Sequence, residues 1–307
     1  MPFAFLCLSL SMLLVGGNIA IGKLILTEVP VYLLAVLRFL IASVVLLPGM
    51  FVGDMRKGLN RRVCGGLFLQ AFFGCFLFSL CMLQGVLHTS ATSAGIITSA
   101  TPSVVALLAW LWLREKISRR QLLAIVLAVA GIALLNLLDR SVAGESSALG
   151  NMLVLGAVLA EALFAVFSRR LSFSVRPWAM AFGVNLSGLL LFLPLALPEV
   201  LAFDWRMPSA ATWAWVLFYA LSASVLSFLL WYRGISQVPA SIAGLFTGLM
   251  PVSSALVGVL LLAEHFSAGH ALGMAFVLAA LLLGTRVRAA AVVPLPPVAA
   301  QRRKASK

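Results

Sequence analysis

The sequence has few charged residues, and acidic ones are the scarcest. Only 10% of its 307 residues are charged, with nine Asp or Glu against 22 Lys or Arg. Soluble proteins carry about 25% charged residues, and a chain that is 63% hydrophobic cannot hide so much apolar surface in one soluble core. The scarcity of charge excludes an ordinary soluble domain and indicates a membrane protein.

The sequence also lacks the motifs of several enzyme classes. Its four cysteines, Cys7, Cys64, Cys75 and Cys81, form no CxxC pair and no Cys/His ligand pattern, so we expect packing residues and neither a disulfide nor a metal site. No Walker, HExxH or GxSxG motif is present, so no ATPase, zinc-protease or serine-hydrolase signature is found. We predict that the chain is not an enzyme and takes no cofactor.

Apolar runs of about 20 residues, long enough as helices to cross a bilayer, recur along the chain. A spanning helix satisfies its own backbone groups. The first run has no basic segment before it and no A-x-A site after it, which favours a retained span over a cleaved signal peptide. The sequence predicts an all-α membrane protein with ten transmembrane helices, at 3–22, 31–50, 66–87, 94–113, 121–138, 149–168, 178–197, 212–232, 241–262 and 269–285.

The basic residues set the expected orientation. With both termini in the cytoplasm, 18 of the 22 Lys and Arg residues fall on the inner side, and only Lys23, Arg140 and Arg206 fall on the outer side. This is the bias that the positive-inside rule describes, and it explains the net charge of +13 without nucleic acid. We expect the tail 289–307 to be basic and disordered, either solvated or touching anionic lipid.

The two halves of the chain resemble each other. A shift of 149 residues aligns 85–135 with 234–284, with 15 identities in 51 positions, and a weaker match has an offset of 147. The halves, 1–140 and 148–288, would each hold five helices, and an odd number makes the second half enter the membrane from the opposite side. This predicts two inverted five-helix repeats, an architecture of many secondary transporters. The matched pairs include Gly85 with Gly234, Thr98 with Thr247, Pro102 with Pro251, and Glu115 with Glu264.

Four segments resemble the EamA-type members of the drug/metabolite transporter superfamily: VGGNIAIGKL, VYLLAVLRFLIA, LQGVLHTSATSAGIITSATPSVVALLAWLWLREKIS and YRGISQVPASIAGLFTGLMPVSSALVGVLLLAEHFS. The resemblance covers about residues 3–286. It implies ten helices, cytoplasmic termini, a central cavity between the halves, and export of amino acids, related metabolites or drugs across the bacterial inner membrane. Glu161 departs from the pattern, because that position of the sixth helix is more often apolar or aromatic.

Two charges, Arg38 and Glu161, fall deep inside predicted spans. At 1.5 Å per residue they lie roughly 12 and 18 Å from the outer ends of their helices, where an unpaired charge costs at least about 2.5–3.5 kcal/mol. One hypothesis is that Arg38 binds a substrate carboxylate while Glu161 binds an amine or carries a proton. The alternative is that the two charges pair with each other or with backbone groups and hold helices together.

Neutral polar residues within the spans are further candidates for substrate binding, with hydrogen bonds between helices as the alternative role. These candidates are Asn18, Gln84, Thr98, Asn185, Tyr219 and Thr247.

Six residues are candidates for gating or structural roles. Pro102 and Pro251 lie about 9–10 residues into their predicted spans, where proline should kink the helix. Glu115 and Glu264 end their spans on opposite sides of the membrane, and we expect local ion pairs for Glu115 and a part in stabilising a gate. Trp231 and Tyr232 are candidates to line an inner gate.

The sequence thus predicts a secondary transporter that exports small metabolites, amino acids being the first choice, by alternating access through a central cavity. A membrane-embedded sensor or scaffold, or a lipid-modifying enzyme without transport activity, is the alternative. The enzyme would need clustered His, Asp and Glu near an interface, and a scaffold would not need an inverted repeat. Expected partners are a small-molecule substrate, the lipid bilayer and, as a coupling ion, protons; the oligomeric state stays open.

Overall fold

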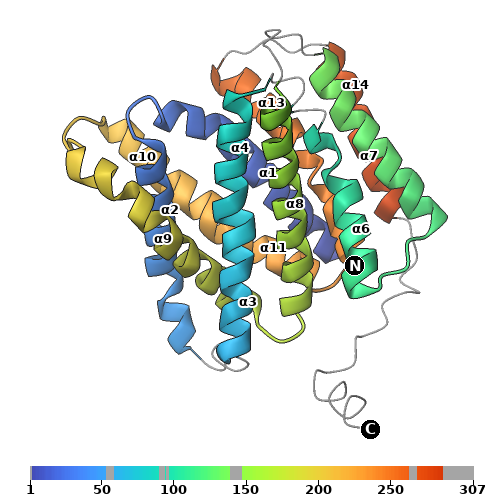
Figure 1. Ribbon diagram of the computed structural model, residues 1–307, viewed down its shortest axis with the longest axis horizontal. Helices are drawn as coiled ribbons and strands as arrows, with labels where there is room; N and C mark the ends of the chain where they lie inside the picture. The colour runs from blue at the N-terminus through green and yellow to red at the C-terminus, as the bar shows by residue number, and fades with distance from the viewer. Residues whose placement is uncertain are drawn as a thin grey trace.

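The computed structural model describes residues 2–52, 59–89, 94, 97–138, 147–262 and 268–285, and this part of the chain is a helical bundle without strands (Figure 1). Three features predicted from the sequence lie largely or wholly outside these residues: Glu264, the boundary between the halves near 140–147, and the tail 289–307. The helices are α1 (Pro2–Ile25), α2 (Val31–Leu46), η1 (Pro48–Phe51), α3 (Arg61–Ala71), η2 (Phe72–Leu77), α4 (Phe78–Leu87), α6 (Thr101–Leu113), α7 (Arg119–Leu138), α8 (Ala148–Leu171), α9 (Pro177–Ala202), α10 (Ala210–Tyr219), η3 (Ala220–Leu226), α11 (Ser227–Ile235), α12 (Ala240–Phe246), α13 (Leu249–Leu262) and α14 (Ala268–Thr285).

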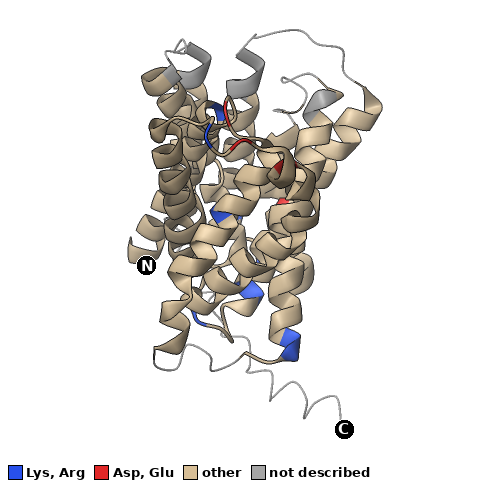
Figure 2. Cartoon of the chain, turned by 90° about the vertical axis from the view of Figure 1, so that its left-hand side faces the viewer, with Lys and Arg blue, Asp and Glu red and all other residues tan. Residues whose placement is uncertain are grey.

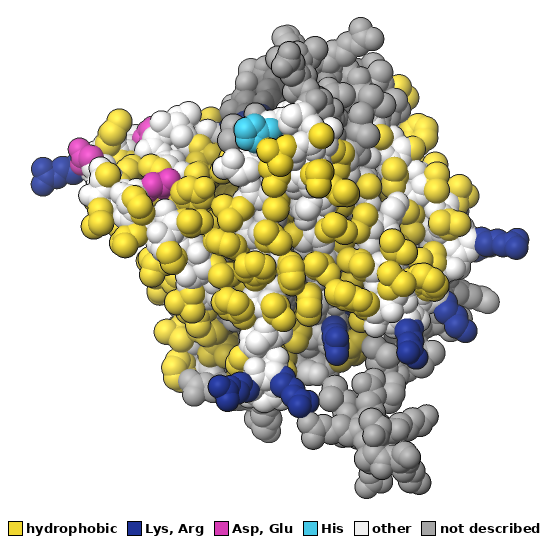
Figure 3. All heavy atoms as spheres, viewed as in Figure 1, with side chains coloured by type: hydrophobic (Ala, Val, Ile, Leu, Met, Phe, Trp, Pro, Cys, Tyr) yellow, Lys and Arg dark blue, Asp and Glu magenta, His cyan; other side chains and the backbone are white. Residues whose placement is uncertain are grey.

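Seven helical segments within the described residues are long and apolar enough to cross a membrane, and two further apolar helices are shorter. Their surfaces carry many large exposed hydrophobic side chains, such as Met152, Leu201 and Leu260. Figure 3 shows a broad hydrophobic belt, with most of the visible Lys and Arg side chains along its lower edge. A surface of this kind fits lipid and not water, so the chain is a multi-pass membrane protein.

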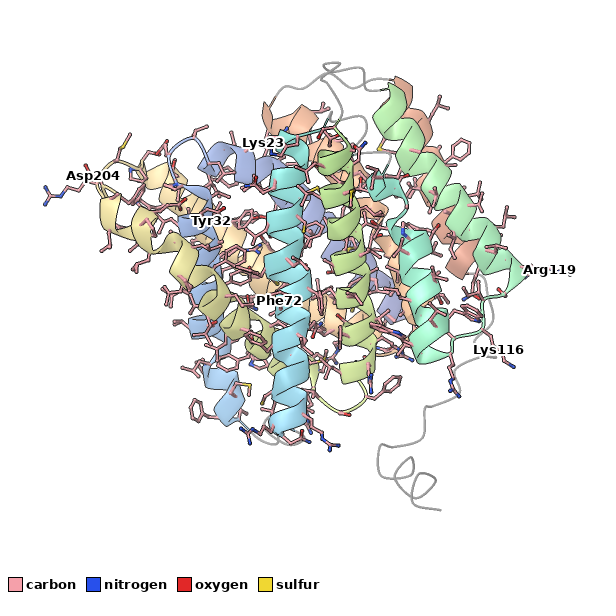
Figure 4. All side chains as sticks on the ribbon, in the orientation of Figure 1. Lys23, Tyr32, Phe72, Lys116, Arg119 and Asp204 are labelled. Carbon is pink, nitrogen blue, oxygen red and sulfur yellow. The ribbon has the colours of Figure 1, made fainter. Side chains whose placement is uncertain are left out.

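The charges separate toward the two ends of the bundle. Figure 4 places Lys23 and Asp204 toward the upper end and Lys116 toward the lower end, and the acidic residues visible in Figure 2 lie in its upper half. In the orientation expected from the sequence, the lower end is the cytoplasmic side.

Helices in the two halves of the chain have corresponding bounds. One constant shift along the sequence carries both ends of α1 onto those of α8 and the start of α2 onto that of α9. The shift found for the stronger sequence match carries the start of α3 onto that of α10 and the start of α4 onto that of α11. Figure 1 shows α3 and α4 running upward while α10 and α11 run downward.

Two of the matched spans contain a π-helical turn, which is wider than an α-helical turn, at corresponding positions in the sequence. The π-helical segments η2 and η3 interrupt the third and eighth predicted spans, and under the stronger sequence match they are in register to within one residue. Short π segments are rare and occur often at functional sites.

Packing follows the same correspondence. α7 packs against α14 and α2 against α9, while α1 lies against α11 and α13 and α8 lies against α4 and α6. A Cβ added to Gly85 would meet Val154 and the Gly150 carbonyl, and one added to Gly234 would meet Leu8 and the Ala4 carbonyl. The contacted residues stand at equivalent places in α8 and α1, because the shift that superposes these two helices carries Leu8 onto Val154 and Ala4 onto Gly150. This shift is one residue smaller than the offset of 147 that the weaker sequence match suggested.

The two prolines expected to kink continuous spans instead stand at the beginning of helices. Pro102 is the second residue of α6, which follows a turn at Ala100, and Pro251 is the third residue of α13, which follows a break at Thr247 and Gly248. Proline fits the first turn of a helix because its missing N–H has no partner there. The fourth and ninth predicted spans are therefore interrupted rather than bent.

Candidate functional site

Arg38 lies on α2 and points into the bundle. Its side chain is half-buried. The guanidinium carbon lies 4.2 Å from the centroid of the Phe39 ring and 6.0 Å from that of Tyr219. These ring faces attract the cation but leave its hydrogen-bond donors available.

Glu161 lies on α8 and also faces the interior. It is half-buried, and it lies on the side of the helix opposite the exposed residues Met152 and Leu159. Its nearest recorded partner is the Thr101 hydroxyl at 3.5 Å, which is the outer limit of a hydrogen bond. That hydroxyl already donates to the Thr98 carbonyl at 2.8 Å, so a charged Glu161 receives little from it.

The other four acidic side chains of the described part of the chain accept hydrogen bonds from backbone N–H groups. Glu28 accepts from the Ser209 N–H, Glu199 from the Leu33 N–H, and Asp204 from the Arg206 N–H. Glu115 accepts from two N–H groups at the start of α12. Glu161 is thus the exception, a carboxyl inside the bundle without a strong partner.

Arg38 and Glu161 do not neutralise each other, since no ion pair joins any Arg and Glu in the described residues around them. Of the alternatives drawn from the sequence, direct pairing of these two side chains is not seen in this conformation. At the rise of an α-helix, Arg38 lies about 10 Å from the start of α2 and Glu161 about 20 Å from the start of α8. The bundle therefore presents a cation and a carboxyl inward, at two depths.

Two of the polar candidates form hydrogen bonds between helices. Asn18 donates to the Leu14 carbonyl and to Ser222 in η3, at 2.8 and 2.9 Å. Asn185 donates to the Ala181 carbonyl and to the Ser224 carbonyl in η3, both at 2.8 Å. Both side chains are buried and fix the π segment to its neighbours. Within the described residues, the Asn185 Oδ1 and Ser224 Oγ atoms have no partner.

The remaining candidates differ in their surroundings. Thr247 is buried and donates to the Gly244 carbonyl at 2.7 Å, at the break between α12 and α13. Thr98 is half-buried at the corresponding break before α6, and Gln84 is exposed on α4. Tyr219 lies near both Arg38 and Gly22, so it joins the surroundings of an interior charge, while the Thr98 carbonyl accepts from Thr101 beside Glu161.

Trp231 and Tyr232 belong to a buried network near the lower end of α8. The Ser168 hydroxyl accepts from Gln70 Nε2 at 2.6 Å and from Trp231 Nε1 at 3.1 Å, and Gln70 also donates to the Tyr232 hydroxyl. The Phe164 ring lies 6.2 to 6.4 Å from the rings of Phe228, Trp231 and Tyr232. Neither aromatic residue lies in an interfacial belt, because both are almost fully buried.

Glu115 does not form the expected ion pairs with its basic neighbours. Arg114 has a left-handed backbone (φ 55°) that ends α6 and turns the chain. The Glu115 carboxylate accepts from the backbone of Ala240 at 2.8 Å, and from the backbone and hydroxyl of Ser241 at 3.0 and 2.8 Å. It therefore caps a helix that is far away in the sequence.

Sequence reasoning missed Arg169, which is one of the 18 basic residues assigned to the inner side. Its Nη1 atom donates to the carbonyls of Ile235 and Ser236, at the end of α11, and its side chain is buried while that of Arg170 is exposed. Its position at the end of an apolar helix hid it, because a pair of arginines there is the ordinary mark of a cytoplasmic boundary.

Comparisons with known proteins identify the family of the chain. The model of the EamA-like transporter family matches the chain twice, at residues 2–137 and 148–286. An "Uncharacterized transporter YetK" of Bacillus subtilis is 42% identical over 280 residues, covering 90% of this chain and 84% of that protein.

Two more distant similarities cover nearly the whole chain. A "Probable amino-acid metabolite efflux pump" of Salmonella typhimurium is 28% identical over 290 residues, covering 91% of this chain and 94% of that protein. A solved crystal structure superposes with a TM-score of 0.76 at 17% identity, covering 92% of this chain and 96% of that one, and so shares the fold. With helices that span a membrane, inward charges and a family model that matches both halves, the chain belongs to the EamA-like transporter family and is a membrane transporter.

Proposed function

We propose that the protein exports small zwitterionic metabolites, amino acids first among them, across a bacterial inner membrane. In this proposal Arg38 binds the substrate carboxylate, and Glu161 binds its amine or carries a coupling proton. The observation that supports it is the pair of opposite charges that face the interior without neutralising each other. The Salmonella protein named as an amino-acid metabolite efflux pump favours the same substrate class.

We further propose that the halves are an inverted repeat that works by alternating access, with both termini in the cytoplasm. The corresponding helix bounds, the matched π segments and the double match to one family model support this reading. Two similar bundles of opposite orientation can exchange conformations, so that states open to either side have similar energies.

Glu161 suits a proton carrier because of its neighbour. The Thr101 hydroxyl gives its hydrogen to the Thr98 carbonyl, so its oxygen can accept a hydrogen bond from a protonated Glu161. A substrate amine or a second conformation would instead favour the deprotonated carboxylate form of Glu161. The start of α6 lies at this point, and the partial positive charge of a helix N-terminus also favours an anion.

The test is transport by the purified protein in liposomes, with an amino-acid panel, cationic drugs, and with or without a pH gradient. Glu161→Gln should abolish the dependence of transport on the pH gradient, while Glu199→Gln, which alters a carboxylate bound to backbone, should retain it. The export proposal fails if no compound moves faster than in empty liposomes. Unchanged pH dependence in Glu161→Gln would remove the proton role of that residue alone.

A further inference from the structure

The two ends of the bundle are closed to different extents. On the lower side, α11 packs against both α8 and α9. The corresponding helices of the first half, α4 with α1 and α2, do not pack together in the same way within their described residues. The corresponding positions also differ in chemistry, since Asn18, Met82 and Leu83 stand where the lower side has Phe164, Trp231 and Tyr232.

Four aromatic rings close the lower side beneath Glu161. Phe164 lies three residues after Glu161, nearly one turn toward the lower end of α8, and its ring contacts those of Phe228, Trp231 and Tyr232 on α11. The Ser168 and Gln70 side chains then bind the polar atoms of Trp231 and Tyr232. A substrate leaving Glu161 toward the lower side would have to separate α8 from α11.

Two charged side chains hold the connection between α11 and α12 just below these rings. Arg169 of α8 binds the carbonyls of Ile235 and Ser236, and Glu115, which follows α6, binds the first two residues of α12. The charges also suit their places, because a helix C-terminus attracts a cation and an N-terminus an anion.

We infer that Glu115, Arg169 and the four rings form an inner gate, and that the Glu115 carboxylate is the latch that keeps it shut while the protein faces outward. This inference rests on the proposed transport function. Glu115 is suited to the role because its hydrogen bonds join the end of a first-half helix to the start of a second-half helix. Such a contact must break if the halves move apart on the cytoplasmic side, and charge-assisted hydrogen bonds are among the strongest available for it.

The test measures the opening of the gate directly. Spin labels on Lys116→Cys and Gln237→Cys, two exposed positions beside the latch, are placed in protein whose native cysteines are replaced by serine. Pulsed electron resonance in liposomes then reports the distances between the labels. We expect one main distance in the otherwise unaltered protein, and a second, longer population that rises about tenfold in Glu115→Gln, since the charge that strengthens these bonds is lost.

Glu28→Gln is the matched control. Its carboxylate also accepts from a backbone N–H at a helix start, that of Ser209, but it lies on the predicted outer side, so the label distances should not change. Ser241→Ala, which removes one of the three bonds, should give a smaller shift than Glu115→Gln and guards against a variant that misfolds. Equal distance distributions in Glu115→Gln, Ser241→Ala and Glu28→Gln would overturn the latch. Because the labels report distances and not flux, an opened gate in liposomes that transport nothing would refute the transport proposal alone.

Discussion

The contact between α1 and α13 allows a sharp test of the packing at the broken ninth span. Gly16 on α1 lies against Met250, the residue before Pro251. A Cβ at position 16 would overlap the Met250 carbonyl oxygen and lie 2.8 Å from its Cα. Both atoms belong to the backbone, so no side chain can rotate away, and the helices must separate to admit even a methyl group.

The magnitude follows from a comparison with Gly65 on α3. A Cβ added there meets nothing within 4 Å. Alanine at position 65 should stabilise the helix by about 0.5–1 kcal/mol, because glycine loses more backbone entropy on folding. Overpacking at position 16 should cost about 1–3 kcal/mol. Gly16→Ala and Gly65→Ala should therefore differ by about 1.5–4 kcal/mol, with opposite signs relative to the parent.

The assay is thermal unfolding of both variants in the same detergent, followed by loss of monodisperse protein. We expect a lower midpoint for Gly16→Ala and an equal or higher one for Gly65→Ala. Equal midpoints would refute the reasoning, because they would mean that α1 and the break in the ninth span do not approach as closely as the structure shows.

Two further predictions concern the interior polar groups. Ser168→Ala removes the acceptor of Gln70 Nε2 and Trp231 Nε1 and should lower stability by about 1–3 kcal/mol. The control Ser236→Ala, at a half-buried hydroxyl bonded to a nearby carbonyl, should change stability little, and equal unfolding midpoints for the two variants would contradict the network. Arg38→Gln should raise the KM for substrates with a carboxylate about tenfold or more, and should affect substrates that carry only an amine less. Arg38→Lys should be intermediate, because an ammonium cannot stack on rings as a guanidinium does. A uniform effect on all substrates would argue for a structural role of Arg38.

Composition and hydrophobic runs were sufficient to predict a helical membrane protein, because the bilayer allows few alternatives. The interior charges Arg38 and Glu161 were also found from sequence, since charges in apolar runs are rare. The breaks before Thr101 and at Thr247 were not found, because both lie in apolar runs that read as continuous helices. Only the position of each proline in the first turn of a helix distinguishes a new start from a kink.

The partners of Glu115 and Arg169 could not be predicted for a different reason. Both residues sit among other charges at the ends of spans, where local pairing or topology gives a sufficient account of them. Their actual partners are backbone groups, which no sequence pattern marks. The choice depends on how α6, α8, α11 and α12 meet, and that is a property of the folded bundle.

The matched π segments bear on the history of the chain. A π turn accommodates one residue more than an α-helical turn, so each of η2 and η3 corresponds to a helix with a single inserted residue. If both halves descend from one ancestral five-helix protein, the simplest history places one insertion before the gene was duplicated and not two insertions afterwards. Any single-copy relative of this fold should then carry the same wide turn in its third helix.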